Sequence, residues 1–171
     1  MRWLWYFIWY SFAGFLLEVI FARLTDHPKK DRKCLILLPL CPVYGLGALM
    51  IRGLVWWNRH PLWVMSAGFL AATTAELLMG AIYRYGLRVE FWDYSRQPWN
   101  LFGLVCLRFS FYWMVLAVLM VYKLDPLVEQ AAGMMPGWLD APAAILTGTD
   151  LAVSAVALRR SGTTEILRWY R

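Results

Sequence analysis

The stretch "LLPLCPVYGLGA", residues 37 to 48, decides what kind of fold this chain can adopt. It lies inside an apolar run from Cys34 to Trp56, long enough to cross a bilayer, since a spanning helix needs about 20 mostly apolar residues. Pro39 and Pro42 each remove a backbone donor and two glycines follow, so the sequence predicts a span that is kinked or broken. A broken helix is tolerated at membrane depth only where protein or a water-filled cavity satisfies the freed backbone groups.

The composition places the whole chain in the same environment. Of its 171 residues, 61% are hydrophobic and 17% aromatic, well above the averages of soluble domains. Eleven Trp and nine Tyr suit the boundary between hydrocarbon and headgroups, where amphipathic rings are most stable. The sequence therefore predicts one integral membrane domain over residues 1–171, with the lipid bilayer as its first partner.

Apolar runs of spanning length recur along the chain. The predicted fold is all-α, a polytopic membrane helix bundle of about five spans: residues 3–22, 34–56, 62–83, 103–122 and 139–158. The first run holds Glu18 and is followed by no small-residue cleavage site, so it is predicted to be a retained span and not a signal peptide. The segment "LDPLVEQAAGMMPGW", residues 124–138, is expected to form a short amphipathic element along the outer surface.

The basic residues predict an orientation. The net charge of +6 comes without a basic helix or an RNA-binding signature, so topology explains it better than nucleic acid does. With the N-terminus outside, the three inner segments hold twelve Lys and Arg (five, three and four) and the outer segments hold four. Because Lys and Arg accumulate in cytoplasmic loops, we expect a cell-membrane protein with an external N-terminus and a cytoplasmic C-terminus.

Four charged residues fall inside the predicted spans, where a lone charge costs at least about 2.5 to 3.5 kcal/mol. They are Glu18, Glu76, Arg108 and Asp150. Depths counted along the helices put them in one layer on the cytoplasmic side of the midplane. Two interpretations stay open: Arg108 pairs with Glu18 and Glu76 only to lock the helices together, or these three residues and Tyr44 line a polar cavity open to the cytoplasm.

The cysteines and histidines indicate no metal site and no cofactor. Cys34, Cys41 and Cys106 form no CxxC pair and have no nearby His in sequence, so neither a disulfide framework nor a zinc site is predicted. Cys41 is expected to be a small packing residue. His27 and His60 lie in loops on opposite sides, so no histidine base is expected in the charged layer.

The polar island "FWDYSRQPWN", residues 91–100, is expected on the cytoplasmic side over this layer. Asp93 is predicted to form an Asx turn, and Asn100 is predicted to cap the fourth span. Trp92 and Tyr94 suit anchoring at the headgroup level. The island could serve only as an anchor, or it could act as a lid that contacts a substrate.

Several segments together resemble a known family. They are "YSFAGFLLEVIF" (10–21), "LPLCPVYGLGAL" (38–49), "TTAELLMG" (73–80), "FWDYSRQPWNLFGLVCLRFSFYW" (91–113) and the late Asp150. This order resembles the CmpB-like family, whose members are described as ABC-transporter type IV proteins. The resemblance carries over these positions: Glu18, Cys41, Pro42, Tyr44, Gly45, Glu76, Trp92, Asp93, Tyr94, Asn100, Gly103 and Cys106.

The resemblance implies a membrane component of a transporter. The chain has no GxxxxGK[ST] motif, so an ATPase would have to be a separate subunit. The favoured hypothesis is a permease-like protein, not an enzyme, working as a homo-oligomer or with such a subunit. Its expected substrate contacts are Glu18, Tyr44, Glu76, Asp93, Tyr94 and Arg108. The alternatives are a membrane-embedded enzyme acting on lipid headgroups and an accessory or scaffold subunit.

Overall fold

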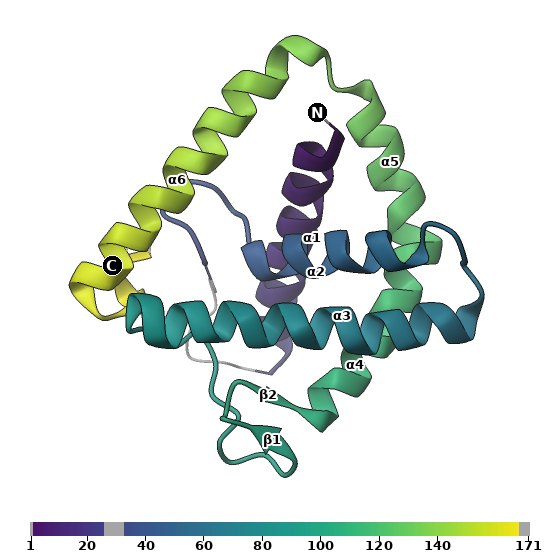
Figure 1. Ribbon diagram of the computed structural model, residues 1–171. Helices are drawn as coiled ribbons and strands as arrows, with labels where there is room; N and C mark the ends of the chain where they lie inside the picture. The colour runs from purple at the N-terminus through teal and green to yellow at the C-terminus, as the bar shows by residue number, and fades with distance from the viewer. Residues whose placement is uncertain (1, 26–32, 168–171) are drawn as a thin grey trace.

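A computed structural model describes residues 2–25 and 33–167, which form a helical bundle with one small β-hairpin (Figure 1). The elements in chain order are α1 (Arg2–Leu24), α2 (Pro42–Val55), α3 (Pro61–Ala81), η1 (Ile82–Leu87), β1 (Asn100–Leu101), β2 (Val105–Cys106), α4 (Leu107–Leu119), η2 (Met120–Leu124), α5 (Asp125–Met134), η3 (Gly137–Leu139), α6 (Asp140–Ser161) and η4 (Thr164–Leu167).

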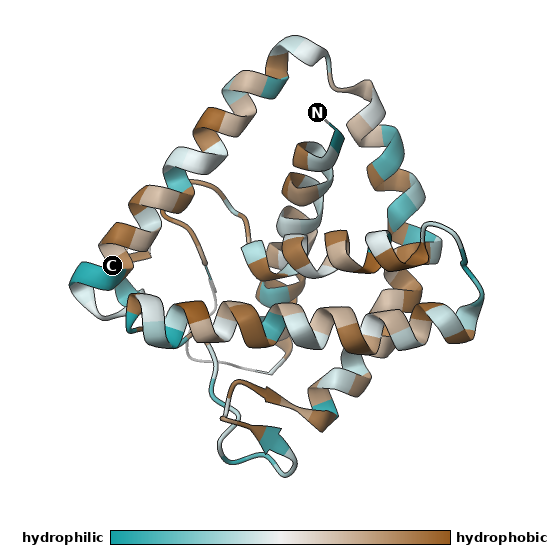
Figure 2. Ribbon diagram, viewed as in Figure 1, coloured by the Kyte–Doolittle hydropathy of each residue, from teal (hydrophilic) through white to brown (hydrophobic). Residues whose placement is uncertain are grey.

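Within the described residues, four helices are long and apolar enough to cross a membrane: Arg2–Leu24, Pro61–Leu87, Leu107–Met134 and Gly137–Ser161. At about 1.5 Å per residue, even the 23 residues of the first exceed a hydrocarbon core of about 30 Å. Hydrophobic residues run along the full length of α3 and α6 (Figure 2), and large side chains such as Leu70 and Ile145 are exposed. The predicted all-α membrane helix bundle is confirmed.

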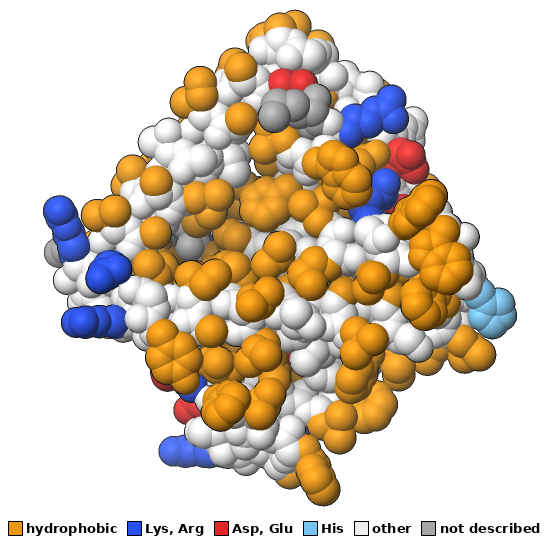
Figure 3. All heavy atoms as spheres, in the orientation of Figure 1, with side chains coloured by type: hydrophobic (Ala, Val, Ile, Leu, Met, Phe, Trp, Pro, Cys, Tyr) orange, Lys and Arg blue, Asp and Glu red, His pale blue; other side chains and the backbone are white. Residues whose placement is uncertain are grey.

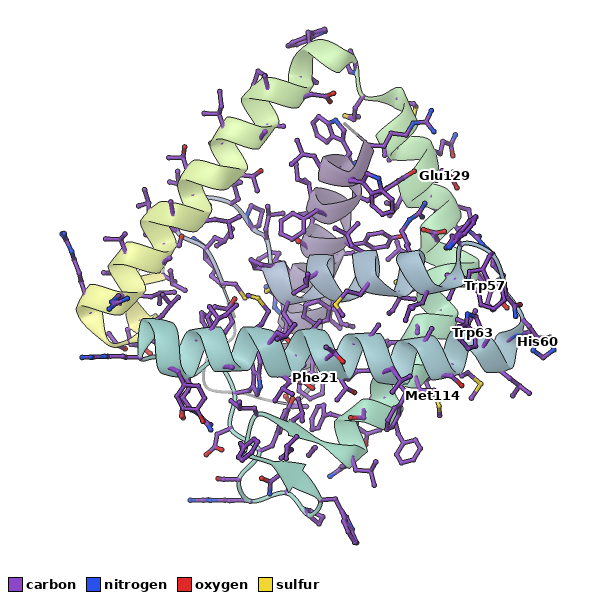
Figure 4. The ribbon with its side chains drawn as sticks, viewed as in Figure 1. Phe21, Trp57, His60, Trp63, Met114 and Glu129 are labelled. Atoms are coloured by element: carbon purple, nitrogen blue, oxygen red, sulfur yellow. The ribbon has the colours of Figure 1, made fainter. Side chains whose placement is uncertain are left out.

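The exposed surface is divided between apolar and charged regions. In the view of Figure 3, hydrophobic side chains cover the middle of the molecule, and most of the visible Lys and Arg side chains lie toward its left edge and its upper right. Figure 4 shows Trp57, His60 and Trp63 together at the turn between α2 and α3, where the two indole rings lie 5.2 Å apart. Tryptophans at a helix turn suit the headgroup boundary of a bilayer.

Small residues bring the central helices close together. The helices α2 and α3 lie side by side and run in opposite directions, with α1 packed on α2 and α4 on α3 (Figure 1). A Cβ on Gly14 would lie 2.2 Å from the Tyr44 ring, and one on Gly68 would lie 2.2 Å from Ala117. Glycine is required at both contacts because a larger side chain would separate the helices.

The second predicted span is broken, as expected. Its first half, residues 34–41, has no helix, and α2 begins at Pro42, whose missing N–H is not needed in a first helical turn. The 14 residues of α2 cover only about 21 Å, less than a bilayer core. The prolines therefore shorten the helix instead of bending a continuous one.

Side chains of α6 and the backbone of α1 accept four of the backbone N–H groups of the non-helical half. The carboxylate of Asp150, fully buried at 0% exposure, accepts the backbone N–H groups of Leu37 (3.1 Å) and Leu38 (2.7 Å). The Ser154 hydroxyl accepts the N–H of Ile36 at 2.9 Å. The N–H of Cys41 donates to the carbonyl of Ser11 at 2.9 Å. Asp150, which was predicted as a structural position, holds the broken span here.

The fourth span begins at Leu107 and not at Gly103, because residues 100–106 form the β-hairpin. The prediction that Asn100 caps this helix is therefore wrong. Its side chain instead closes the hairpin turn, accepting the N–H of Gly103 at 2.9 Å and donating to the carbonyl of Gln97 at 2.8 Å. Gly103 has a φ of +70°, a conformation in which glycine avoids the strain of other residues.

The prediction that residues 124–138 form a separate surface element is wrong. A π-helical turn, η2, joins α4 to α5, so one helix runs from Leu107 to Met134 through Pro126. A π-turn changes the local hydrogen-bond pattern, which lets the helix pass the proline. Val128 and Ala132 then pack against Tyr6 and Tyr10 of α1.

The bonds to Asp150 generate a stability prediction. Asp150→Ala should lower the free energy of unfolding by about 3 kcal/mol or more, because a buried donor left unsatisfied costs about 1 to 3 kcal/mol and two backbone donors lose their acceptor. Asp150→Asn keeps one acceptor oxygen and should lose about half as much. Denaturant unfolding of the purified protein in detergent measures both, with Glu129→Gln as the exposed control; equal stability of Asp150→Ala and the control would contradict this role.

Candidate substrate chamber

A cavity of about 630 Å³ lies where α1, α2, α3 and α4 meet the island between η1 and β1. We call it the loop-side chamber. Five of the six predicted substrate contacts line it: Glu18, Tyr44, Glu76, Asp93 and Tyr94. The chamber has the size of a typical small-molecule site.

Glu76 is the most buried acid of the chamber. Its side chain, on α3, is 3% exposed. The Tyr94 hydroxyl donates to its Oε1 at 2.8 Å, and the Trp113 indole N–H donates to its Oε2 at 3.0 Å. Among the described residues, no Lys or Arg forms an ion pair with Glu76. Neutral donors from the island and from α4 therefore hold this carboxylate.

Glu18 joins the same group through Tyr44. The Tyr44 hydroxyl donates to Oε1 of Glu18 at 2.6 Å. The Tyr44 ring packs edge-on against Trp113, with centroids 5.6 Å apart. Hydrogen bonds and ring contacts thus connect the two carboxylates across four helices and the island.

The island folds over the chamber through its own hydrogen bonds. Asp93 forms the predicted Asx turn, accepting the N–H of Ser95 at 2.8 Å and its hydroxyl at 2.9 Å. These bonds, the backbone bond first, lower the pKa of Asp93 below its usual value. The Trp92 indole donates to the carbonyl of Leu104 at 2.8 Å, and the backbone of Tyr94 donates to Gly103 at 2.8 Å. The hairpin therefore fixes the island in place.

Tyr94 is the residue through which the island reaches the buried acid. Its ring stacks on Phe109 of α4 with centroids 4.7 Å apart. Burial, and then the nearby Glu76 carboxylate, raise the pKa of the Tyr94 hydroxyl above its ordinary value. Tyr94 therefore stays protonated, and its hydroxyl donates to Glu76.

Arg108 does not join the chamber. Its side chain is exposed, and its Nε donates to the Tyr112 hydroxyl at 3.0 Å. The prediction that it points into the bundle beside Glu18 and Glu76 is wrong. Ser110 and Ala117 mark the buried face of α4, and Arg108 is two residues from Ser110, which is roughly 200° around a helix of 3.6 residues per turn.

The remaining predicted positions shape the chamber's surroundings. Cys41 and Cys106 are buried at 0% and 1% exposure and precede the first residues of α2 and α4. Pro42 begins α2, and Gly45 lets α2 approach α1, since a Cβ there would lie 2.2 Å from the Ser11 hydroxyl. Within the described residues, no three His, Cys, Asp or Glu side chains are grouped to hold a metal ion.

A second cavity, of about 350 Å³, adjoins the first, and we call it the inner chamber. Both chambers share a wall that includes Tyr44, Glu76 and Trp113. From this wall the inner chamber extends past Ile51 and Leu124, and its lining is almost entirely apolar. This chamber could not be predicted from the sequence, because its walls are mostly apolar and small residues like those of any packed helix.

A buried charge cluster on α5 was not predicted from the sequence. Asp125, at 1% exposure, accepts the Tyr10 hydroxyl, pairs with Arg52 and lies 3.1 Å from Arg59. This cluster ties α1, α2 and the loop after α2 to α5. Arg52 and Arg59 both precede the third span, on the side expected to be external. Asp125 was expected on the same side, and this shared location was the signal in the sequence that could have predicted the ion pairs.

Apolar helices of spanning length around internal chambers define a multi-pass membrane protein of transporter-like architecture. A family model described as "Putative ABC-transporter type IV" matches residues 5–155 of the chain. The chain belongs to this CmpB-type family, which confirms the resemblance seen in the sequence. No curated protein and no solved structure shows significant similarity to it.

The hydrogen bond from Tyr94 to Glu76 generates a second prediction. Tyr94→Phe should lower the free energy of unfolding by about 1 to 3 kcal/mol, because a buried carboxylate loses a donor. The matched control is Tyr85→Phe, since Tyr85 is 69% exposed. In a double-mutant cycle with Glu76→Gln, denaturant unfolding should give a coupling of at least about 0.5 kcal/mol. Strictly additive losses would show that the bond does not contribute.

Proposed function

We propose that the protein is the membrane component of a small-molecule transport system and that the loop-side chamber is its substrate site. The observation that carries this proposal is the buried carboxylate of Glu76, held by Tyr94 and Trp113 at the wall between two cavities. Glu18, Tyr44, Asp93 and Tyr94 are the other proposed contacts. Arg108 is left out because its side chain lies outside the chamber.

The two chambers provide the elements of a pathway through the bundle. The loop-side chamber lies beneath the island, and the inner chamber extends toward Lys123 and Leu124. The Tyr44 and Trp113 rings, which line both cavities, lie between them. We propose that a substrate enters beneath the island and passes this pair of rings when Tyr44 and Trp113 separate.

The family description supports a partner that supplies the energy. ABC-type transport needs an ATPase, and the printed sequence contains no phosphate-binding GxxxxGK[ST] motif. We therefore propose a separate ATPase subunit, with a second copy of this chain as the other half of the membrane component.

The arrangement of basic residues supports an external N-terminus and a cytoplasmic C-terminus. Arg84 and Arg88 at the end of the third span lie at the same end of the bundle as Arg159 and Arg160, since α6 packs on η1 through Tyr83 and Leu158. At the opposite end, Asp125 pairs with Arg52 and Arg59. This pairing leaves the excess positive charge on the proposed cytoplasmic side.

Reporter fusions in a bacterial host test this orientation. Green fluorescent protein fused after residue 171 should fluoresce, because it folds in the cytoplasm. Alkaline phosphatase at the same position should be inactive, because its disulfides form only in an oxidising compartment. An active phosphatase fusion with a dark fluorescent one would reverse the orientation.

The transport proposal is tested in whole cells, where every partner is present. Cells that express the wild-type chain should show at least a twofold change in the intracellular to extracellular ratio of one or more small molecules, measured by untargeted mass spectrometry. Glu76→Gln should abolish the change because the site loses its buried charge.

The control is Glu129→Gln, because Glu129 is an exposed carboxylate on α5 (Figure 4). It should behave as the wild type. If Glu76→Gln accumulates to wild-type levels in the membrane and gives the same ratios as the wild type, the proposed site is wrong.

A further inference from the structure

Within the described residues, the lining of the loop-side chamber has acidic but no basic side chains, and Arg84, outside the lining, lies 3.9 Å from Asp93. Glu18, Glu76 and Asp93 line the chamber, and among the described residues no Lys, Arg or His does. The two oxygens of Glu76 accept bonds from the Tyr94 hydroxyl and the Trp113 indole, which are both neutral. The chamber therefore offers a negative charge that neutral dipoles hold in position, and a bound cation would complete it.

Aromatic rings form most of the remaining wall. Phe21, Tyr44, Phe91, Trp92, Tyr94, Phe109, Tyr112 and Trp113 line the chamber. The Phe109 ring stacks on Tyr94 at 4.7 Å and meets Tyr112 edge-on at 5.4 Å, so the rings form a continuous surface. Ring faces attract organic cations, while a bare metal ion needs a shell of oxygen ligands. The wall thus favours an organic cation.

The inner chamber extends the site beyond the charged group. It begins at the wall with Glu76, Tyr44 and Trp113, and its lining is nearly all apolar. A molecule whose charge lies beside Glu76 can place an apolar substituent in this cavity without losing the contact. A compact, fully hydrated cation would leave the inner chamber unused.

We propose that the two chambers together bind an amphipathic organic cation. Its charged group lies in the loop-side chamber beside Glu76 and Glu18, and its apolar arm lies in the inner chamber. This inference rests on the proposed function and names the class of substrate.

Two probes of nearly equal shape and opposite charge test the inference. Tetraphenylphosphonium and tetraphenylborate are titrated into the full chain in nanodiscs, with empty nanodiscs subtracted. We expect the cation to bind at least tenfold more tightly than the anion. Glu76→Gln should reduce this ratio at least fivefold, and Glu129→Gln should leave it unchanged. Equal affinities for the two probes, or a ratio unaffected by Glu76→Gln, would overturn the proposal.

Two further variants distinguish the contributions of the charged group and the apolar arm to binding from a failure of the variant to fold. Glu18→Gln should also reduce the ratio, which keeps the test decisive if Glu76→Gln does not fold. Ala13 lines the inner chamber. Ala13→Phe should therefore weaken the binding of tetraphenylphosphonium at least fivefold. The affinity for tetramethylammonium should stay unchanged, because this smaller cation has no apolar arm to place in the inner chamber. Equal weakening of both cations would refute the assignment of the inner chamber.

Failure of this inference can be distinguished from failure of the transport proposal. A charge preference that depends on Glu76, without any change in whole-cell metabolite ratios, would identify a cation-binding protein that does not transport. Metabolite changes that depend on Glu76, without preference for the cationic probe, would keep transport and reject this substrate class.

Discussion

The backbone of residues 34–41 sets the constraint on which the rest of the bundle depends. Inside a bilayer, backbone groups outside a helix must find partners in the protein itself. Here Asp150 and Ser154 of α6 and the carbonyl of Ser11 on α1 provide them. Because this half is not helical, α2 begins at Pro42, and Tyr44 in its first turn reaches Glu18. The break in the second span thus creates one wall of the loop-side chamber.

Two buried carboxylates of the bundle have different hydrogen-bond and ion-pair partners. Near α5, Asp125 is almost fully buried and is surrounded by two arginines and a tyrosine, so its charge is compensated within the protein. Glu76, equally buried, receives only neutral donors among the described residues. A compensated cluster fixes helix positions, whereas a carboxylate held by neutral dipoles keeps its capacity to attract a cation. This difference distinguishes the packing cluster at Asp125 from the proposed binding site at Glu76.

Much of the fold could be predicted, because apolar run lengths and prolines act locally. Hydropathy located the spans, and Pro39 and Pro42 located the break. The orientation of single side chains could not be predicted so well, since it depends on where each helix begins. Asn100 appeared to precede a helix but closes a hairpin, and Arg108 lies opposite the buried face of α4. For the chamber, the acids and Tyr94 were visible in the sequence, while the apolar and aromatic walls were not.

The contact between Asp150 and Leu38 also orders events during synthesis. The two residues are separated by 112 positions in the chain. A ribosome therefore delivers the non-helical segment to the membrane long before its acceptor exists. Until the last span is inserted, water, lipid headgroups or the insertion machinery must accept these backbone donors. A nascent chain without α6 would therefore leave the N–H groups of Leu37 and Leu38 without their Asp150 acceptor.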